Sequence, residues 1–245
     1  MMSITLVFGF EVVIEHLSFF YKIFDKKSQN LFLPKPFFER EKRYRKVKGY
    51  EVDGQRFYIK KYSNCFEEAN SEWRNLLRLR ELGFSVPEPF FIRKRPDKLE
   101  IATFELKGKP LSELLKNKEL QANLIYKLAE LLSALHLKRL YHQDCYLNHF
   151  FWEEETEILG FLDVSRVLSN PRFSLKYQIK DLAQLGYSFE EYFGEKGAFL
   201  FQKFLSRYLE LSKSKPAWLV KFLVEFKIWL IRRRTKRARL KGKKL

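Results

Sequence analysis

Two aspartates and a histidine in one region of the chain have the spacing of a phosphoryl-transfer site. Asp144 lies in the stretch YHQDCYLNHFFW, residues 141–152; His149 follows five positions later, and Asp163 stands in the apolar run FLDVS. In kinases, one aspartate orients the attacking hydroxyl and accepts its proton, a residue five positions on helps to hold Mg²⁺, and a second aspartate bridges the metal to the phosphates of ATP. This order predicts an ATP-dependent kinase in which Asp144 is catalytic and His149 and Asp163 bind Mg²⁺.

Other polar residues nearby leave alternatives open. Asn148 competes with His149 as a metal ligand, because an amide oxygen suits hard Mg²⁺ better than an imidazole nitrogen does. We expect His142 to brace the loop and His136 to be a core histidine. Asp181, in KDLAQL, is either a helix-surface charge or, as in kinase-like folds, a support for the loop backbone.

The sequence upstream offers the lysine and glutamate that a kinase needs to grip phosphates. Lys60 in FYIKKY takes the place of the lysine in the V-A-I-K pattern, and Glu72 in NSEWRNLL is the glutamate expected to hold it. Glu67 and Glu68 lie nearer the start of the same helix and are alternatives to Glu72. Since side chains alternate along a strand, only one of Lys60 and Lys61 can face the cleft.

The elements that carry this lysine and glutamate follow from local patterns. The runs GYEVDG and RFYIKKY predict a hairpin that turns at Asp53-Gly54. Apolar spacing over residues 64–84 predicts a helix that ends at Gly83. The runs VPEPFFIRK and LEIATFEL predict two further strands.

After KGKP the pattern becomes helical. We expect helices in LSELLKN, ANLIYKLAELLSALHLKRL, YQIKDLAQLGYSFEEYF, KGAFLFQKFLSRYLELS and the segment after Pro216, with short strands in HFFW and ILGFLDV. The predicted fold class is α+β, with a small β-rich lobe that has one helix and a larger α-helical lobe. We expect an extension over residues 1–44, the small lobe over 45–106, the larger lobe over 107–230 and a basic tail over 231–245.

Two further segments are assigned by position and composition. TFELKGKP, residues 103–110, is the expected connector between the lobes, and its backbone around Glu105 and Leu106 is expected to hydrogen-bond adenine. Residues 22–48 mix proline and charge with little periodicity and predict an extension or linker.

These motifs together resemble the lipopolysaccharide kinase family, over roughly residues 45–190. The most specific is the loop, which reads H-x-D-C-Y-x-x-H-F, and ILGFLDVSR, KDLAQL and SEWRNLLRLRELGFSVPEP also resemble the family. The resemblance implies a bilobal protein-kinase-like fold, ATP and Mg²⁺ as cofactors, and a lipid A-linked core oligosaccharide as the acceptor. The heptose kinases of the family have the most similar loop, so heptose is the expected sugar.

The resemblance also assigns roles to individual residues. It implies that Asp144 is the catalytic aspartate, that Asp163 binds the metal, and that Lys60 and Glu72 form the phosphate-binding pair. It places His149 where protein kinases have asparagine.

Three departures from protein kinases are visible. The first hairpin lacks G-x-G-x-x-G and has only Gly49 and Gly54, so a less glycine-rich turn would cover the phosphates. Gln143 replaces the arginine before the catalytic aspartate, so regulation by an activation-loop phosphate is not expected. Val-Ser rather than Phe-Gly follows Asp163, as in the sugar kinases.

Composition limits the compartment and the partners. The chain has 47 Lys+Arg against 30 Asp+Glu, a net charge of +17, which favours polyanionic partners. Two cysteines without metal-ligand spacing favour a reducing cytosol. The apolar N-terminal segment is interrupted by Glu11 and Glu15, so it predicts an amphipathic helix rather than a signal peptide or a transmembrane helix.

The tail IRRRTKRARLKGKKL contains nine basic residues and no acid. It is either a solvated extension or, with Trp218, Phe222, Phe226 and Trp229 before it, a membrane-surface element; packing of that aromatic stripe in the core is equally compatible with the sequence. We therefore expect a cytoplasmic protein with a peripheral contact to the inner membrane, and no nucleic acid partner. An atypical protein kinase, a small-molecule phosphotransferase and a non-catalytic basic binding module are the alternatives, and the oligomeric state is left open.

Overall fold

The structure is a computed structural model of the 245-residue chain, and it describes residues 4–7, 9–28, 30–42, 44–212 and 216–241. The chain forms two compact units. The first consists of Met1–Lys107 and Gly160–Ser165, and the second of Gly108–Leu159 and Arg166–Leu245. Residues 242–245 of the predicted basic tail lie outside the described residues. Every helix in the described part of the chain is too short or too polar to span a bilayer.

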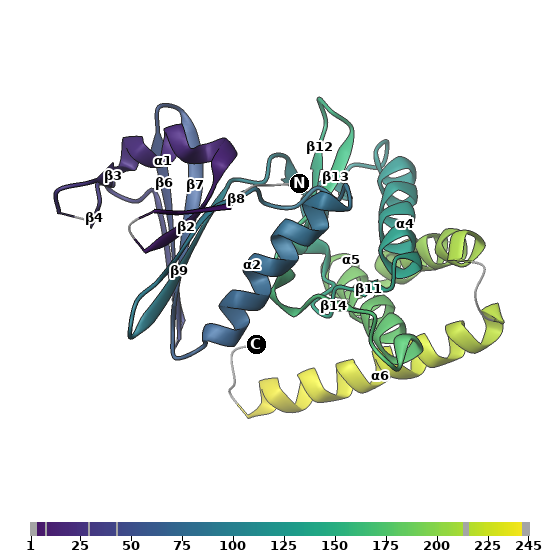
Figure 1. The fold of residues 1–245 in the computed structure, drawn as a ribbon. Helices are drawn as coiled ribbons and strands as arrows, with labels where there is room; N and C mark the ends of the chain where they lie inside the picture. Colours follow the sequence, from purple (N-terminus) through teal and green to yellow (C-terminus); the bar gives the residue numbers. More distant parts are fainter. Residues whose placement is uncertain (1–3, 8, 29, 43, 213–215, 242–245) are drawn as a thin grey trace. The chain divides into compact units, whose positions relative to one another are not determined.

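The first unit is built on a seven-stranded antiparallel sheet with the strand order β1-β2-β8-β9-β7-β6-β5 (Figure 1). Its strands are β1 (Ile4–Val7), β2 (Phe10–Val13), β5 (Phe38–Lys42), β6 (Arg45–Val52), β7 (Gln55–Ser63), β8 (Pro89–Lys94) and β9 (Lys98–Phe104). A separate two-stranded ribbon joins β3 (Phe24–Asp25) to β4 (Asn30–Leu31).

The predicted hairpin is confirmed as β6 and β7. Val52 pairs with Gln55, so the loop contains two residues, Asp53 and Gly54. Both have positive φ, 52° and 76°. This is the backbone of a type I′ turn, which matches the twist of the paired strands and favours Asp-Gly.

Helices lie on both faces of this sheet. The predicted helix is confirmed as α2 (Phe66–Glu81), and the chain leaves it through Gly83, whose φ is 83°. On the other face, α1 (Leu17–Ile23) contributes to an aromatic-rich core that includes Phe10, Phe20 and Phe57. Figure 1 shows α1 and α2 on opposite sides of the strands.

The N-terminal segment differs from the expectation. Only Leu17–Ile23 forms an α-helix, after a 3-10 turn over Ile14–His16, while the residues before them form β1 and β2 of the sheet. The expected linker over residues 22–48 supplies the edge strand β5, which pairs with β6. All residues of β5 are exposed, so this strand has no buried face and no apolar alternation by which to recognise it. Charged side chains on an edge strand also discourage pairing with other chains.

The second unit is mostly helical. Its helices are α3 (Leu111–Leu114), α4 (Gln121–Leu137), α5 (Ser174–Ser212) and α6 (Ala217–Leu240), and its strands are β10 (Lys109–Pro110), β11 (Leu140–Tyr141), β12 (Phe150–Glu153) and β14 (Leu168–Ser169), with a 3-10 turn, η2, over Leu147–His149. The chain passes out of this unit within β13 (Ile158–Phe161) and returns within η3 (Val164–Arg166). A sheet-rich first unit and a helical second unit confirm the predicted α+β class.

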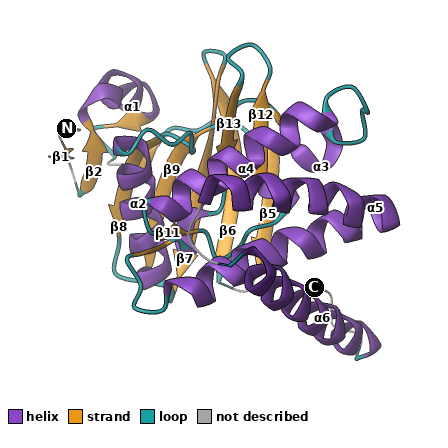
Figure 2. Ribbon diagram, turned by 90° about the vertical axis from the view of Figure 1, so that its right-hand side faces the viewer, coloured by secondary structure: helices purple, strands orange, loops and turns teal. Residues whose placement is uncertain are grey.

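The long helix α5 is two helices joined at a kink. Gly194 has a non-helical backbone, with φ 58° and ψ −135°, a combination that only glycine adopts readily. Helix α5 packs against α4 (Figure 2), and α6 packs on α5. After the kink, Gly197 lies so close to the backbone of Phe189 that a Cβ atom there would be 2.0 Å from its carbonyl oxygen.

Candidate active site

Lys60 and Glu72 form an ion pair in the first unit. Lys60 extends from β7 to the carboxylate of Glu72 on α2, which is only 2% exposed. The hydroxyl of Tyr62, two residues further along β7, donates to the same carboxylate. Burial, followed by the charge of Glu72, raises the pKa of Tyr62 above its ordinary value, so the hydroxyl stays protonated and remains a donor. Glu72 is therefore fixed by two partners and holds the lysine ammonium in place.

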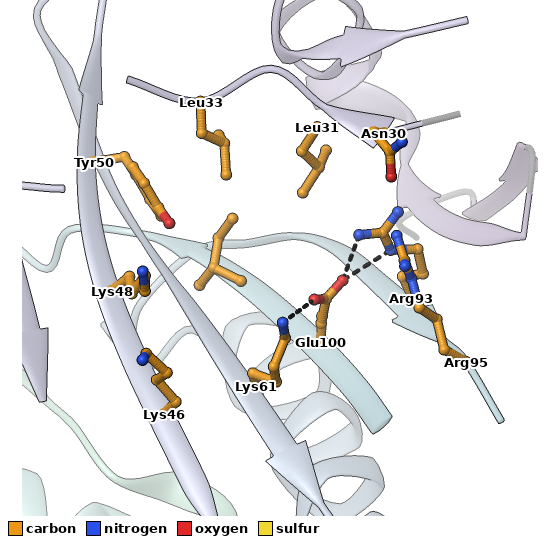
Figure 3. A pocket seen from close by; sticks show the side chains of 11 residues that line it. Asn30, Leu31, Leu33, Lys46, Lys48, Tyr50, Lys61, Arg93, Arg95 and Glu100 are labelled. Carbon is orange, nitrogen blue, oxygen red and sulfur yellow. Dashed lines mark hydrogen bonds and ion pairs between the residues drawn. The ribbon is translucent and has the colours of Figure 1, made fainter. Parts of the chain in front are cut away.

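Lys61 points to the opposite face of the sheet. Its ammonium is 3.3 Å from Glu100, which also accepts two hydrogen bonds from Arg93, of 2.6 and 2.8 Å. These side chains line a hollow of about 370 Å³ together with Lys46, Lys48, Arg95, Tyr50, Asn30, Leu31, Leu33 and Ile59. Figure 3 shows Lys61, Glu100 and Arg93 at this hollow. Of the two adjacent lysines, Lys60 is thus the one that faces α2.

Asp163 belongs to a segment that the first unit holds by its backbone. The N–H of Phe161 donates to the carbonyl oxygen of Ser85 over 3.0 Å, and the side-chain amide of Asn75 donates to the carbonyl oxygen of Val164 over 2.8 Å. Between them, Asp163 has a left-handed backbone with φ 58°. A non-glycine residue in this conformation is uncommon and costs conformational energy.

Asp163 pairs with Arg45, whose role was not predicted from the sequence. Its guanidinium is 3.5 Å from Asp163 and 3.8 Å from Glu68. Burial alone would lower the pKa of Arg45, but the charges of Asp163 and Glu72, together with a hydrogen bond to Tyr62, raise it above its ordinary value. Glu68, which the sequence offered as an alternative to Glu72, thus pairs with Arg45 rather than with Lys60. No sequence motif distinguishes Arg45 from the other basic residues in KRYRKVK.

In the second unit, the loop that carries Asp144 is anchored by Asp181 of α5. Asp181 is fully buried, and its two carboxylate oxygens accept the N–H groups of His142 and Gln143, each over 2.7 Å. His136 of α4 lies 3.2 Å from the same carboxylate and is buried, as expected of a core histidine. Of the two readings of Asp181, the structure therefore supports the one in which it holds the loop backbone.

Two further residues on the same face of α5 hold the loop, and neither was predicted from the sequence. Gln184 accepts the N–H of Cys145 over 3.2 Å, and Ser188 accepts the N–H of Leu147 over 2.9 Å. Their positions, three and seven residues after Asp181, place all three side chains on one helix face, a spacing that could have revealed them.

Burial and nearby carboxylates raise the pKa of Cys145 well above its usual range, so it packs as a neutral thiol.

His149 is oriented by the backbone of Asp144. Its Nδ1 atom is 2.8 Å from the carbonyl oxygen of Asp144. A carbonyl oxygen only accepts, so Nδ1 carries a hydrogen, and a metal would be bound through Nε2. A ring nitrogen of His149 and a carboxylate oxygen of Asp144 lie within 4.8 Å of each other, and Arg166 is 4.0 Å from Asp144. Carboxylate oxygen with neutral imidazole fits a divalent cation, and Asn148 beside them is exposed.

The connector residues use part of their backbone within the first unit. The N–H of Glu105 donates to the carbonyl oxygen of Arg56 over 3.0 Å, and its side chain accepts a 3.0 Å hydrogen bond from Tyr58. Burial and the Glu105 charge raise the pKa of Tyr58 to about 12. The remaining main-chain groups of the pair are the carbonyl of Glu105 and the amide and carbonyl of Leu106.

Comparison with solved structures shows the fold. "WaaP in complex with acyl carrier protein" is similar with a TM-score of 0.60 and 21% identity, covering 84% of this chain and 89% of that chain. "Aminoglycoside-3'-phosphotransferase of type VIII" is similar with a TM-score of 0.57 and 15% identity, over 74% and 88% of the two chains. Aminoglycoside phosphotransferase APH(3'')-Id from Streptomyces rimosus has a TM-score of 0.55 and 13% identity, over 76% and 92%. These likenesses confirm the predicted protein-kinase-like fold.

Comparison of sequences shows the family. No curated protein matches the chain. Residues 59–208, however, match the profile described as "Lipopolysaccharide kinase (Kdo/WaaP) family". The match includes both Lys60 and the loop that carries Asp144, and it supports an ATP-dependent kinase that acts on a hydroxyl group. The chain belongs to the lipopolysaccharide kinase (Kdo/WaaP) family.

Proposed function

We propose that this kinase phosphorylates a hydroxyl group of heptose in the inner core of a lipid A-linked oligosaccharide, with Mg²⁺ and ATP. The observation that carries the proposal is the H-x-D-C-Y-x-x-H-F loop, held by Asp181, Gln184 and Ser188 so that Asp144 stays partly exposed while its neighbours are buried. The choice of heptose rests on the likeness of this loop to the heptose kinases. Cys145 is fully buried, so it shapes the loop rather than contacting the sugar.

Each unit supplies part of the proposed chemistry. Asp144 would orient the sugar hydroxyl and accept its proton at the carboxylate. Lys60, fixed by Glu72, would bind the α and β phosphates of ATP. Asp163 and His149 would hold Mg²⁺, which neutralises phosphate charge when it is bound.

The backbone of the connector and the side chain of Arg45 would support nucleotide and metal binding. The carbonyl of Glu105 and the amide of Leu106 would hydrogen-bond adenine. Arg45, whose guanidinium is 3.5 Å from Asp163, would hold the Asp163 carboxylate in position.

The test is transfer of labelled phosphate from ATP to defined acceptors. The purified chain is incubated with dephosphorylated lipopolysaccharide core, with a core that ends at Kdo, with a protein mixture and with an aminoglycoside. We expect product only on the acceptor that contains heptose. Label only on the acceptor that ends at Kdo would show that Kdo, the sugar named in the family description, is the acceptor instead of heptose. Label on protein or on the aminoglycoside would support one of the alternative kinase classes.

Two substitutions test the assigned residues. Asp144→Asn and Asp163→Ala should each abolish transfer, since one removes the proton acceptor and the other a metal ligand, and both side chains are partly exposed, so the fold should persist by circular dichroism. Lys61→Met is the matched control for Lys60→Met, because only Lys60 faces Glu72. Full activity of either aspartate variant would refute the assignment.

The location and partners follow from the acceptor. A lipid-linked core oligosaccharide would be met at the cytoplasmic face of the inner membrane, and the net charge of +17 would help to concentrate a phosphorylated acceptor there. Nucleic acid is not proposed as a partner. A non-catalytic basic module would be favoured instead if the protein bound no nucleotide in the presence of Mg²⁺.

A further inference from the structure

Helix α6 has a buried face that attaches it to the second unit. Val220, Val224 and Ile228, spaced four residues apart, are at most 4% exposed. The side chain of Ile228 reaches Gly186 of α5, where an added Cβ atom would be 2.6 Å from its Cδ1 atom. Residues four apart lie on one face of a helix, so this narrow apolar row accounts for the packing of α6.

A second row of large apolar side chains on α6 remains exposed. Trp218, Phe222, Phe226 and Trp229 are 71%, 62%, 52% and 46% exposed. Steps of four, four and three residues place them on one face, away from the buried row. The rings of Phe226 and Trp229 stack with centroids 5.8 Å apart. Of the alternatives for this stripe, the exposed fractions exclude packing in the core. A contiguous exposed aromatic row is typical of an interaction surface.

Positive charge continues along the same face toward the C-terminus. Arg233 and Lys236 lie four and seven residues after Trp229, both are exposed, and the Arg233 guanidinium stands over the Trp229 ring at 5.4 Å. Arg232 and Arg239 have another role: they contact Glu190 and Glu191 of α5, over 2.8 and 2.5 Å. The basic residues of α6 thus divide into a pair that fastens the helix and others that face outward.

We propose that the docking face, formed by Trp218, Phe222, Phe226, Trp229, Arg233 and Lys236, binds the surface of an anionic lipid bilayer. Tryptophan and phenylalanine enter the headgroup region of a bilayer, while arginine and lysine contact its anionic headgroups. Residues 231–241 contain seven Lys and Arg and no Asp or Glu, so charge complementarity favours anionic lipid. The inference rests on the proposed function in one respect, that a lipid-anchored acceptor would lie at such a surface. Binding of the docking face to the bilayer itself requires no catalysis.

Vesicle sedimentation of the full chain tests the docking face. Vesicles of equal parts phosphatidylglycerol and phosphatidylcholine should bind the protein, and pure phosphatidylcholine should not. A basic residue near an anionic leaflet strengthens binding about fivefold, so Arg233→Glu with Lys236→Glu, which removes two basic residues and adds two acidic ones, should weaken it by at least about twenty-five-fold. Trp218→Ser with Phe222→Ser should also abolish most of the binding while leaving the circular dichroism spectrum unchanged.

The chain offers matched controls. Phe173 and Phe199 are 64% and 61% exposed in the same unit, and each has a cationic neighbour, Arg172 and Lys203, so Phe173→Ser with Phe199→Ser removes equivalent aromatic surface from another place. This variant should bind vesicles normally. If it lost binding as strongly as the α6 variants, or if the α6 variants bound normally, the docking face would be wrong.

Tryptophan fluorescence gives an independent measurement. Trp73 and Trp152 are 4% and 6% exposed, so brominated lipid should quench only the emission of Trp218 and Trp229. Absence of quenching would overturn the proposal. The proposal would also be overturned if the chain bound an acidic acyl carrier protein through this face but did not bind vesicles.

Activity separates this inference from the proposed function. The α6 variants should phosphorylate a water-soluble, delipidated core oligosaccharide at the rate of the unaltered chain. If the unaltered chain bound vesicles but phosphorylated no sugar, the proposed function would fail and the docking face would stand.

Discussion

At the scale of single residues, buried partners determine which of several similar side chains can serve the chemistry. Glu72 contacts both Lys60 and Tyr62, whereas Glu68 pairs with Arg45 and Glu67 is exposed. The lysine position therefore depends on one buried carboxylate. Holding a flexible ammonium in a productive position is the contribution that such a pair makes in a kinase.

Glu72→Gln should separate this positioning role from folding. The amide keeps the shape but loses the charge that holds Lys60, so we expect kcat/KM to fall about tenfold to a hundredfold, or about 1.4–2.7 kcal/mol of transition-state stabilisation. The measurement is steady-state kinetics with varied ATP. Glu67→Gln, an exposed change on the same helix, should leave the kinetics unaltered; equal losses in both variants would contradict the argument.

Asp181→Asn tests the anchor of the catalytic loop. An amide can satisfy at most one of the two N–H groups that the carboxylate accepts, and the site is fully buried. We expect a loss of about 2–4 kcal/mol in the free energy of unfolding, measured by urea denaturation, and slower phosphate transfer. The exposed Glu195→Gln change in α5 should shift stability by about 0.5 kcal/mol or less, and a similarly small effect at Asp181 would show that it does not support the loop.

At the scale of helices and strands, elements with a local signal were predictable. The Asp53-Gly54 turn and the apolar spacing of α2 are properties of adjacent residues, and the structure has both. Strand β5 has no buried side chain, so its place in the sheet depends on pairing with β6 rather than on a pattern of its own. Arg45 likewise has its role through its ion pair with Asp163. The two residues are too far apart in the sequence for their spacing to indicate the pair. Asp181, Gln184 and Ser188, in contrast, have the spacing of one helix face, which can be recognised in the sequence.

Gly197→Ala tests the close packing at the α5 kink. The added Cβ would lie 2.0 Å from the carbonyl oxygen of Phe189. Because that oxygen belongs to the backbone of a helix, it cannot move aside as a flexible side chain can. We therefore expect this overpacking to lower the free energy of unfolding by about 1–3 kcal/mol. Urea denaturation measures the change. Lys196→Ala, at the neighbouring exposed position, should be near neutral, and if Gly197→Ala were equally mild, the two helical halves would be less tightly packed than the structure shows.

At the scale of the whole molecule, the net charge of +17 acts on encounter rather than on chemistry. Electrostatic attraction to a phosphorylated micellar acceptor is screened by salt, because the Debye length falls from about 10 Å at 0.1 M to about 3 Å at 1 M. We expect the KM for micellar lipopolysaccharide to rise several-fold over this range while kcat changes little. An uncharged soluble acceptor is the control, and a KM that did not depend on salt for either acceptor would show that the charge has no part in recognition.

The adjacent lysines of β7 also provide an internal standard for chemical labelling. Lys60 and Lys61 share a tryptic region and a backbone environment, yet one faces Glu72 and the other the hollow of Figure 3. A nucleotide that carries a reactive acyl phosphate should acylate Lys60, with competition by ATP, and modify Lys61 only as fast as a nucleotide-free reagent does. The ratio of the two adducts in a single mass spectrum would therefore report occupancy of the nucleotide site without any knowledge of the acceptor.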